Sequence, residues 1–369
     1  MRIGDREIGP QADVYIIAEL GVNHDGSVER ALELTDAAAD AGADAVKLQL
    51  FHTDLLMSKA AKLAAYQKAA GETDPVAMLR RLELPIREMA RVVDRAHARG
   101  LHAIVTVFSV ELVAEAQTLA WDAYKTASPD IIHRPLLDAL AATGKPMIVS
   151  TGASTMEEVE RAVGWFPAAR GRLALMQCVS SYPTDFYEGG WAGIHAIKER
   201  FGLPTGYSDH IDNPEDPTRR IVSASQAVQC GARLLEKHLT DDRELVGPDH
   251  ALSVTPSEFC EYARLARDTA KRFGSGRPME TKSLHGSADI HVRTDDKTVL
   301  PVERDVRSVS RQSLVTRGPL RADQRVRRED LTFKRPGTGI EPWRIDEVVG
   351  RQTQRAVEAD VPLTDADLV

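Results

Sequence analysis

Residues 14–26 read VYIIAELGVNHDG, an apolar run that ends in an acid and continues into a polar loop. The same order, with a longer amphipathic stretch after each loop, recurs as far as about residue 275. Eight such strand-then-helix units predict a (β/α)8 TIM barrel, and no GxGxxG follows the first run, as an open dinucleotide-binding sheet would require. The apolar runs lie at 14–18, 45–50, 102–107, 123–126, 146–150, 173–178, 205–208 and 233–238.

Helix-start signals fill the intervals between these runs. Thr155 and Glu158 have the spacing of a capping box before a periodic stretch, and Thr255 and Glu258 repeat it with Pro256 in the first turn. We therefore expect helices to begin at these two places.

Composition excludes several classes of protein. The chain has 369 residues, of which 43% are hydrophobic and 28% charged, as in an ordinary globular protein. No apolar run approaches the roughly 18 residues that span a bilayer, and residues 1–11 do not resemble a secretory signal, so we expect a cytoplasmic protein without membrane contact. The net charge of −8 and an aromatic content of 5% argue against a nucleic-acid partner.

The charge distribution divides the chain into parts. The polar stretch GSGRP to RTDD reads as a linker, and residues 307–335 after it are locally basic. We predict a TIM-barrel catalytic domain at 1–275, a linker at 276–305 and a small domain at 306–369. The basic run fits a solvated face, an RNA-binding tail, or a site for carboxylate or acetamido oxygens.

Polar residues gather where the predicted strands end. A barrel brings the carboxyl ends of its strands to one rim, where active sites of this fold lie. Side chains alternate along a strand, so Lys47 and Gln49 share one face, while Leu48 and Leu50 take the other. The predicted rim residues are Glu19, Lys47, Gln49, Thr106, Lys125, Ser128, Ser180, Ser208, His210, Glu236 and His238.

His210 and His238 end the seventh and eighth runs, which are neighbours in a barrel that closes in sequence order. Two imidazoles there could bind one divalent metal, although a histidine is more often simply hydrogen-bonded. The three cysteines are widely spaced without a CxxC pair, which argues against a thiolate zinc site.

Lys47 and Lys125 have three interpretations. Two inward lysines need an anion to stay charged, which a phosphorylated, carboxylated substrate would supply. Salt bridges to internal acids such as Glu19 would also satisfy them, and a Schiff-base lysine is the third possibility. The hydroxyls of Thr106, Ser128, Ser180 and Ser208 favour phosphate and carboxylate binding.

Two acids complete the predicted rim. Glu19 is the natural acid or base, unless it only pairs with a lysine. Asp249, in the segment GPDH after the eighth run, lies at the barrel mouth unless this segment forms a simple turn.

In chain order these motifs resemble the sialic acid synthases and the bacterial relatives that make legionaminic or pseudaminic acid. The resemblance spans nearly the whole chain. The matching stretches are YIIAELGVNHDGS (15–27), AGADAVKLQ (41–49), AAYQK (64–68), LELP (82–85), GKPMIVSTG (144–152), SSYPT (180–184), GYSDH (206–210), EKHLT (236–240), GPDHALS (247–253) and KRPGTGI (334–340).

The resemblance implies a barrel followed by a small β-rich SAF, or antifreeze-like, domain. It also implies condensation of phosphoenolpyruvate with N-acetylmannosamine or a related 2-acetamido or 2,4-diacetamido hexose, with C–O cleavage of phosphoenolpyruvate, giving a nonulosonic acid and phosphate. The cofactor would be a divalent metal, manganese with magnesium as the alternative, and the enzyme a domain-swapped homodimer.

Matching positions carry roles over from the family. The metal ligands would be His210 and His238, and Arg335 would enter the partner's barrel. Glu19, Gln49, Tyr182 and Asp249 would face the sugar. Phosphoenolpyruvate would contact Lys47, Thr106, Lys125, Ser128, Ser180 and Ser208.

The chain departs from the family at two strand ends. VTVF stands at 105–108 where many members have STPF, and KTASPD at 125–130 where they have K-x-x-SGE. Asp130 therefore replaces a glutamate in a loop that we expect to touch the sugar, which leaves the acceptor open.

Two further functions compete with the synthase. A Schiff-base aldolase would use free pyruvate, with Lys47 or Lys125 as the nucleophile. A non-catalytic protein would bind carbohydrate or ice through its SAF-type domain.

Overall fold

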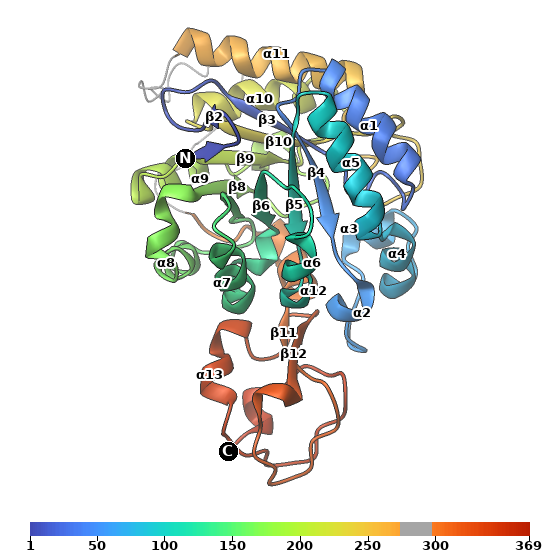
Figure 1. Cartoon of the computed structure of the whole chain (residues 1–369), viewed down its shortest axis with the longest axis vertical. Coiled ribbons are helices and arrows are strands. Elements are labelled where there is room, and N and C mark those ends of the chain that lie inside the picture. Colours follow the sequence, from blue (N-terminus) through green and yellow to red (C-terminus); the bar gives the residue numbers. More distant parts are fainter. Residues whose placement is uncertain (274–296) are drawn as a thin grey trace.

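A computed structural model of the chain describes residues 1–273 and 297–369, and it confirms the predicted barrel. Eight parallel strands close in sequence order, with the last pairing with the first (Figure 1). The strands are β3 (Tyr15–Glu19), β4 (Ala45–Leu50), β5 (His102–Val107), β6 (Ala123–Thr126), β7 (Met147–Ser150), β8 (Leu173–Cys178), β9 (Thr205–Asp209) and β10 (Leu234–His238).

The register of the barrel brings the polar strand ends to one level. Glu19 pairs with Lys47 on one side and with His238 on the other, across the closure of the barrel. Thr106 lies opposite both Gln49 and Lys125. The residues expected at the rim therefore face a common space, because neighbouring parallel strands end together.

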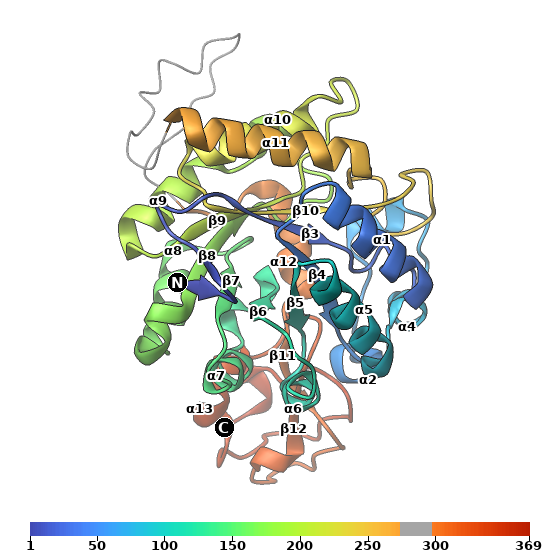
Figure 2. The same cartoon turned by 45° about the horizontal axis from the view of Figure 1, so that its top comes forward.

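Helices surround the strands (Figure 2). The outward side chains of the strands are buried in the core between the two layers. Leu48 and Leu50 belong to this outer core, as their alternation with Lys47 and Gln49 predicted. Both expected helix starts are present: Glu158 accepts a hydrogen bond from the backbone N–H of Thr155, and Glu258 accepts one from that of Thr255. The helices are α1 (Val28–Asp40), α2 (Thr53–Leu56), α3 (Ala65–Ala69), α4 (Pro75–Leu82), α5 (Ile86–Ala98), α6 (Val113–Ala116), α7 (Arg134–Ala142), α8 (Met156–Gly164), α9 (Trp191–Phe201), α10 (Arg219–Gln229) and α11 (Pro256–Phe273).

A short hairpin closes the other end of the barrel. Its strands, β1 (Arg2–Ile3) and β2 (Arg6–Glu7), pair antiparallel. Ile3 and Ile8 pack with inward side chains of the barrel strands in a separate apolar cluster. The site is therefore built on a filled barrel floor rather than above a channel.

The C-terminal part, residues 311–369, lies beside the carboxyl ends of the barrel strands (Figure 1). It has its own apolar core around one small antiparallel sheet, β11 (Ser313–Thr316) with β12 (Leu331–Lys334), and isolated bridges extend the pairing. One further helix, α13 (Ile345–Val348), packs on it. Gln312 donates to the backbone carbonyl of Phe108, at 2.8 Å, and so joins this part to the barrel mouth.

The predicted linker is described only at its end. Residues 276–296 lie outside the described residues. Residues 297–305 run through a short 3₁₀ turn, η6 (Pro301–Glu303), into helix α12 (Arg304–Ser310), and the Lys297 carbonyl accepts from the backbone N–H of Met156. This end of the segment thus packs on the barrel, and the exact domain boundaries stay predictions.

No helix within residues 1–273 or 297–369 is both long enough and apolar enough to cross a membrane.

Candidate active site

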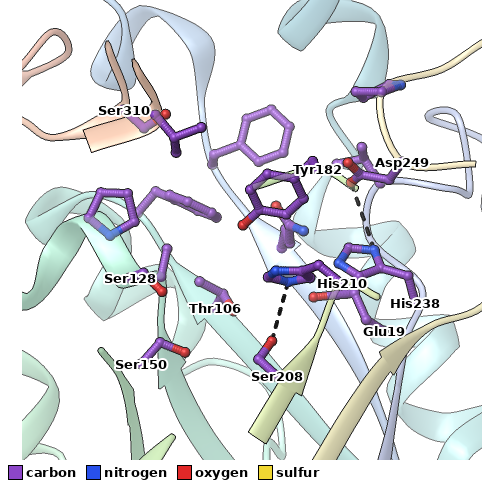
Figure 3. A pocket seen from close by; sticks show the side chains of 18 of the residues that line it. Glu19, Thr106, Ser128, Ser150, Tyr182, Ser208, His210, His238, Asp249 and Ser310 are labelled. Atoms are coloured by element: carbon purple, nitrogen blue, oxygen red, sulfur yellow. Dashed lines mark hydrogen bonds and ion pairs between the residues drawn. The ribbon is translucent and has the colours of Figure 1, made fainter. Parts of the chain in front are cut away.

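A cavity opens at the carboxyl ends of the barrel strands, and almost every predicted site residue lines it (Figure 3). The exception is Ser180, which is buried beside it. The two predicted lysines and the two predicted histidines, distant in the chain, share this one cavity. The predicted residues that line it are Glu19, Lys47, Gln49, Thr106, Lys125, Ser128, Tyr182, Ser208, His210, His238, Asp249 and Arg335.

Glu236 connects the two lysines at the base of the cavity. Its Oε1 lies 3.3 Å from Lys125 Nζ and 3.7 Å from Lys47 Nζ, and it accepts a hydrogen bond from Ser208 Oγ at 2.9 Å. Lys47 also pairs with Glu19. The salt-bridge interpretation of the lysines is therefore present in the structure.

Burial dominates the electrostatics of this cluster. Loss of hydration lowers the pKa of Lys47 to about 7, although the charge of Glu236 acts in the opposite direction. Burial alone would raise the pKa of Glu236, but Lys125 and Lys47 hold it below its ordinary value. The base of the cavity is a low-dielectric site in which an added charge must find a partner.

Two residues that the sequence interpretation did not assign, Ser150 and Cys178, add a hydroxyl and a thiol to the polar groups of the cavity. Ser150, at the end of β7, accepts a hydrogen bond from Lys125 Nζ at 2.8 Å. Cys178 Sγ lies 2.9 Å from Ser128 Oγ, which also accepts from the Gly152 N–H. The position of Ser150 in VSTG at a strand end was the available signal for this residue.

Gly152 is required by this packing. A Cβ placed on it would lie 2.4 Å from both Cys178 Sγ and Ser180 Oγ. The Ser180 hydroxyl has no hydrogen-bond partner among the described residues. A buried unpaired hydroxyl is costly, so it marks a place for a further polar group.

His210 and His238 face each other across the mouth, with ring centroids 5.7 Å apart. His210 Nδ1 donates to the carbonyl of Val179 at 2.9 Å, which leaves Nε2 for Ser208 and the cavity. Burial lowers the pKa of His210 to about 4 and holds the pKa of His238 well below its ordinary value. Both imidazoles are therefore neutral at pH 7, the form that binds metals.

The described residues form no cluster of three or more His, Cys, Asp or Glu side chains around a possible ion. The Asp249 carboxylate lies beside the pair, with its Oδ2 3.9 Å from His238 Nδ1 (Figure 3). The donor set fits a metal only if substrate or water supplies the remaining ligands, as in an open catalytic site.

Backbone groups of Gly21 hold the side chains of Glu19 and Gln49 at the cavity mouth. Glu19 Oε1 accepts from the Gly21 N–H, and Gln49 donates to the Gly21 carbonyl, each at 2.8 Å. Burial raises the pKa of Asp249 to about 6. The ring of Tyr182 lies 4.3 Å, centroid to centroid, from that of His210.

Arg335 reaches the cavity of its own barrel. Its backbone N–H donates to the Leu56 carbonyl, and its guanidinium lies 5.6 Å from the centre of the Phe108 ring. We expected this arginine to enter a partner's barrel. The single chain supplies it in cis, and exchange between subunits stays a prediction.

The loop that contains Asp130 lines the cavity, but Asp130 itself does not. It is buried behind Pro129, where its Oδ1 accepts from Gln312 at 3.2 Å. Burial raises the pKa of Asp130 to about 7, against the charge of Arg335. Ala127, Ser128 and Pro129 are the residues of this loop that line the cavity, and whether the loop contacts the sugar stays a prediction.

One wall of the cavity is apolar, in contrast to the polar base. Its side chains also form a separate hydrophobic cluster near the mouth, over β4, α2 and α4. A ligand in this cavity meets charged groups at one end and hydrocarbon at the other. The wall consists of Val22, Phe51, Leu56, Met78, Leu79, Leu82 and Phe108.

Comparison with known proteins gives the same family as the motifs. The NeuB family model matches residues 34–278, and the SAF domain model matches 311–369. The N,N'-diacetyllegionaminic acid synthase of Legionella pneumophila is 32% identical over 98% of this chain and 96% of its own. The pseudaminic acid synthase of Campylobacter jejuni is 26% identical over 100% and 99%.

Solved structures agree with this assignment. The spore coat polysaccharide biosynthesis protein SpsE of Bacillus subtilis has a TM-score of 0.83 at 28% identity and covers 100% of this chain and 99% of its own. The N-acetylneuraminic acid synthetase of Leptospira borgpetersenii has a TM-score of 0.65 at 31% identity, with 75% and 90% covered. The chain belongs to the NeuB family and carries a SAF domain at residues 311–369.

Proposed function

We propose that the protein condenses phosphoenolpyruvate with an N-acetylated amino sugar, giving a nonulosonic acid and phosphate. One observation carries this proposal: two lysines with hydroxyl partners lie at the base of the same cavity whose mouth holds two neutral histidines. The relatives named as legionaminic and pseudaminic acid synthases support the same class of reaction.

The base of the cavity suits the two anionic groups of phosphoenolpyruvate. Lys47 donates to Thr106 Oγ1 at 3.1 Å, and Lys125 to Ser150. A bound phosphate or carboxylate would take these donors over, because charge-assisted hydrogen bonds to an anion are stronger than those to a neutral hydroxyl. The unpaired Ser180 hydroxyl would supply a further donor.

The reaction needs one new carbon–carbon bond and one C–O cleavage. C3 of the enol attacks the aldehyde carbon of the open-chain sugar, and the aldehyde oxygen takes up a proton. Water adds at C2, and phosphate then leaves with its bridging oxygen. We assign to Glu19 the transfer of the water proton, because its carboxylate lies beside Lys47 at the strand end.

A divalent metal, manganese with magnesium as the alternative, would be held by His210 and His238. When bound it would polarise the aldehyde oxygen as a Lewis acid. The charges of the cavity support the need for a metal. Its lining contains three basic side chains and three acidic ones, so the side chains alone offer an anionic substrate little excess positive charge. These are Lys47, Lys125 and Arg335, and Glu19, Glu236 and Asp249.

The apolar wall bears on the acceptor. We propose a 2,4-diacetamido-2,4,6-trideoxyhexose, which presents two acetamido methyl groups and a deoxy carbon to Phe51, Leu79 and their neighbours. A 6-phosphate against this wall would lose its hydration without gaining a cation. Arg335 would contact an acetamido oxygen. The single chain places Arg335 in its own cavity, and we propose that in a homodimer the two chains exchange their SAF domains, so that each cavity receives the partner's arginine in the same position.

The test is phosphate release from phosphoenolpyruvate with each acceptor, with manganese, magnesium or chelator. We expect kcat/KM to be at least about tenfold higher for the trideoxy sugar than for N-acetylmannosamine, since burial of a few methyl groups supplies this factor. Equal values would contradict the acceptor assignment. If phosphate is released with neither the trideoxy sugar nor N-acetylmannosamine, the synthase proposal is contradicted.

A Schiff-base pyruvate aldolase is the second candidate, and the lowered pKa of Lys47 favours it, since a neutral amine is the nucleophile. Borohydride reduction with pyruvate, followed by intact mass, separates the two. A stable adduct on Lys47 would support the aldolase and defeat the synthase.

A further inference from the structure

The segment that leads from the barrel to the SAF domain forms hydrogen bonds with the loop that follows β7, at the end of the barrel that holds the cavity. We call residues 297–311 the connecting arm. Ala153 follows β7, and its N–H donates to Glu303 Oε1 of the arm at 2.6 Å. The carbonyl of Ala153 accepts from Arg307 at 2.5 Å and from Arg311 at 3.2 Å. Both backbone polar groups of one buried residue are thus held by arm side chains.

Ala153 has a backbone conformation that needs such support. Its φ is +49°, in the left-handed region that residues with a Cβ rarely adopt. Strained residues of this kind persist where the surroundings hold them, and they gather at functional sites. The connecting arm provides this support for Ala153 through its hydrogen bonds to both backbone groups.

Glu303 joins two loops of the proposed anion site. The same Oε1 that accepts from Ala153 accepts from the Ser180 N–H at 2.8 Å, across the ends of β7 and β8. Ser150, at the end of β7, contacts Lys125, and the N–H of Gly152, in the loop that follows, contacts Ser128. The Glu303 side chain is almost fully buried, at 1% exposure, so no water competes for the two amides.

We propose that Glu303 is a positioning residue for phosphoenolpyruvate: it fixes the Ala153 and Ser180 backbones, and the anion site is complete only when the connecting arm is docked. The ligand identity rests on the proposed function. The positioning does not, since it follows from the contacts of the arm alone.

The test compares three full-length variants with the wild type. Glu303→Ala removes the acceptor. Glu303→Gln keeps a carbonyl oxygen of the same reach. Val302→Ala is the matched control, because Val302 is exposed on the same turn. Phosphoenolpyruvate affinity is measured by titration calorimetry without acceptor sugar, and hydrogen exchange of peptides covering 150–156 and 179–182 is followed without any ligand.

We expect Glu303→Ala to weaken phosphoenolpyruvate binding by about tenfold or more, the factor that corresponds to one lost buried hydrogen bond. Glu303→Gln should lie between it and the wild type, and Val302→Ala should match the wild type. Exchange of both peptides should accelerate in Glu303→Ala while circular dichroism stays native. KM for phosphoenolpyruvate should rise more than KM for the acceptor.

Two results would overturn the inference. One is a Glu303→Ala protein that binds phosphoenolpyruvate as the wild type does. The other is hydrogen exchange of the two peptides in Glu303→Ala at the same rate as in the wild type. This measurement needs no ligand, so it tests the positioning role even if the wild type does not bind phosphoenolpyruvate. Absence of binding by the wild type would instead contradict the proposed function.

Discussion

Replacing Glu158 with glutamine should destabilise the protein by about 3 kcal/mol at pH 7. Glu158, on α8, accepts hydrogen bonds from Arg307 at 2.8 Å and from Arg311 at 2.7 Å, both from the connecting arm. Burial raises the pKa of its carboxyl group, but the two arginines outweigh burial and bring it to about 2, from 4.5. Each pKa unit is worth about 1.36 kcal/mol, which gives the stated figure.

The pH dependence has a definite sign. Because the folded-state pKa lies below the unfolded value, the stabilisation is complete above about pH 4.5 and is lost as the pH falls towards about 2. The difference between wild type and Glu158→Gln should therefore shrink to about half at pH 3. Glutamine keeps the shape of the side chain but has no charge at any pH.

Urea unfolding followed by circular dichroism at pH 7, 5 and 3 measures this difference. Glu157→Gln is the control, because Glu157 neighbours Glu158 on the helix but is exposed. It should leave the urea midpoint nearly unchanged. A Glu158→Gln midpoint equal to that of the wild type, or a difference that does not vary with pH, would refute the ion-pair account of arm docking.

Three further predictions concern turnover. Burial lowers the pKa of Lys47 to about 7, so kcat/KM for phosphoenolpyruvate should fall about tenfold for each pH unit above 7. Lys47→Arg should remove this alkaline decrease, because arginine stays charged. A wild-type kcat/KM that does not change with pH above 7 would contradict a role for charged Lys47. His210→Ala should abolish metal-dependent turnover with native circular dichroism, whereas full activity in chelator would exclude the metal role. If Arg335 acts in the partner's barrel, coexpressed Arg335→Ala and His210→Ala chains should recover about a quarter of wild-type activity through mixed dimers; no recovery would indicate that each chain completes its own site.

The barrel and most of its rim could be predicted because both follow from local patterns. Short apolar runs gave every barrel strand to within one residue, and side-chain alternation placed Lys47 inward and Leu48 outward. Closure of the barrel in sequence order also predicts that His210 and His238 are neighbours, and their ring centroids lie 5.7 Å apart.

The remaining features depend on contacts between distant parts of the chain. Glu303 lies in a segment that reads as a linker, and only the fold brings it to Ala153 and Ser180. The loop around Asp130 was expected to touch the sugar, and only the fold shows that the Asp130 side chain itself is held away from the cavity by Gln312. The left-handed conformation of Ala153 carries no sequence signal, since alanine favours helices.

The central claim, that this cavity condenses phosphoenolpyruvate with C–O cleavage, is tested most directly by an isotope. Phosphoenolpyruvate labelled with ¹⁸O at the bridging oxygen is incubated with the wild-type enzyme, the acceptor sugar and manganese, and the released phosphate is analysed by mass. We predict that the phosphate keeps the label, since the bond between C2 and the bridging oxygen breaks. Unlabelled phosphate, with the label retained in the keto acid, would contradict the account.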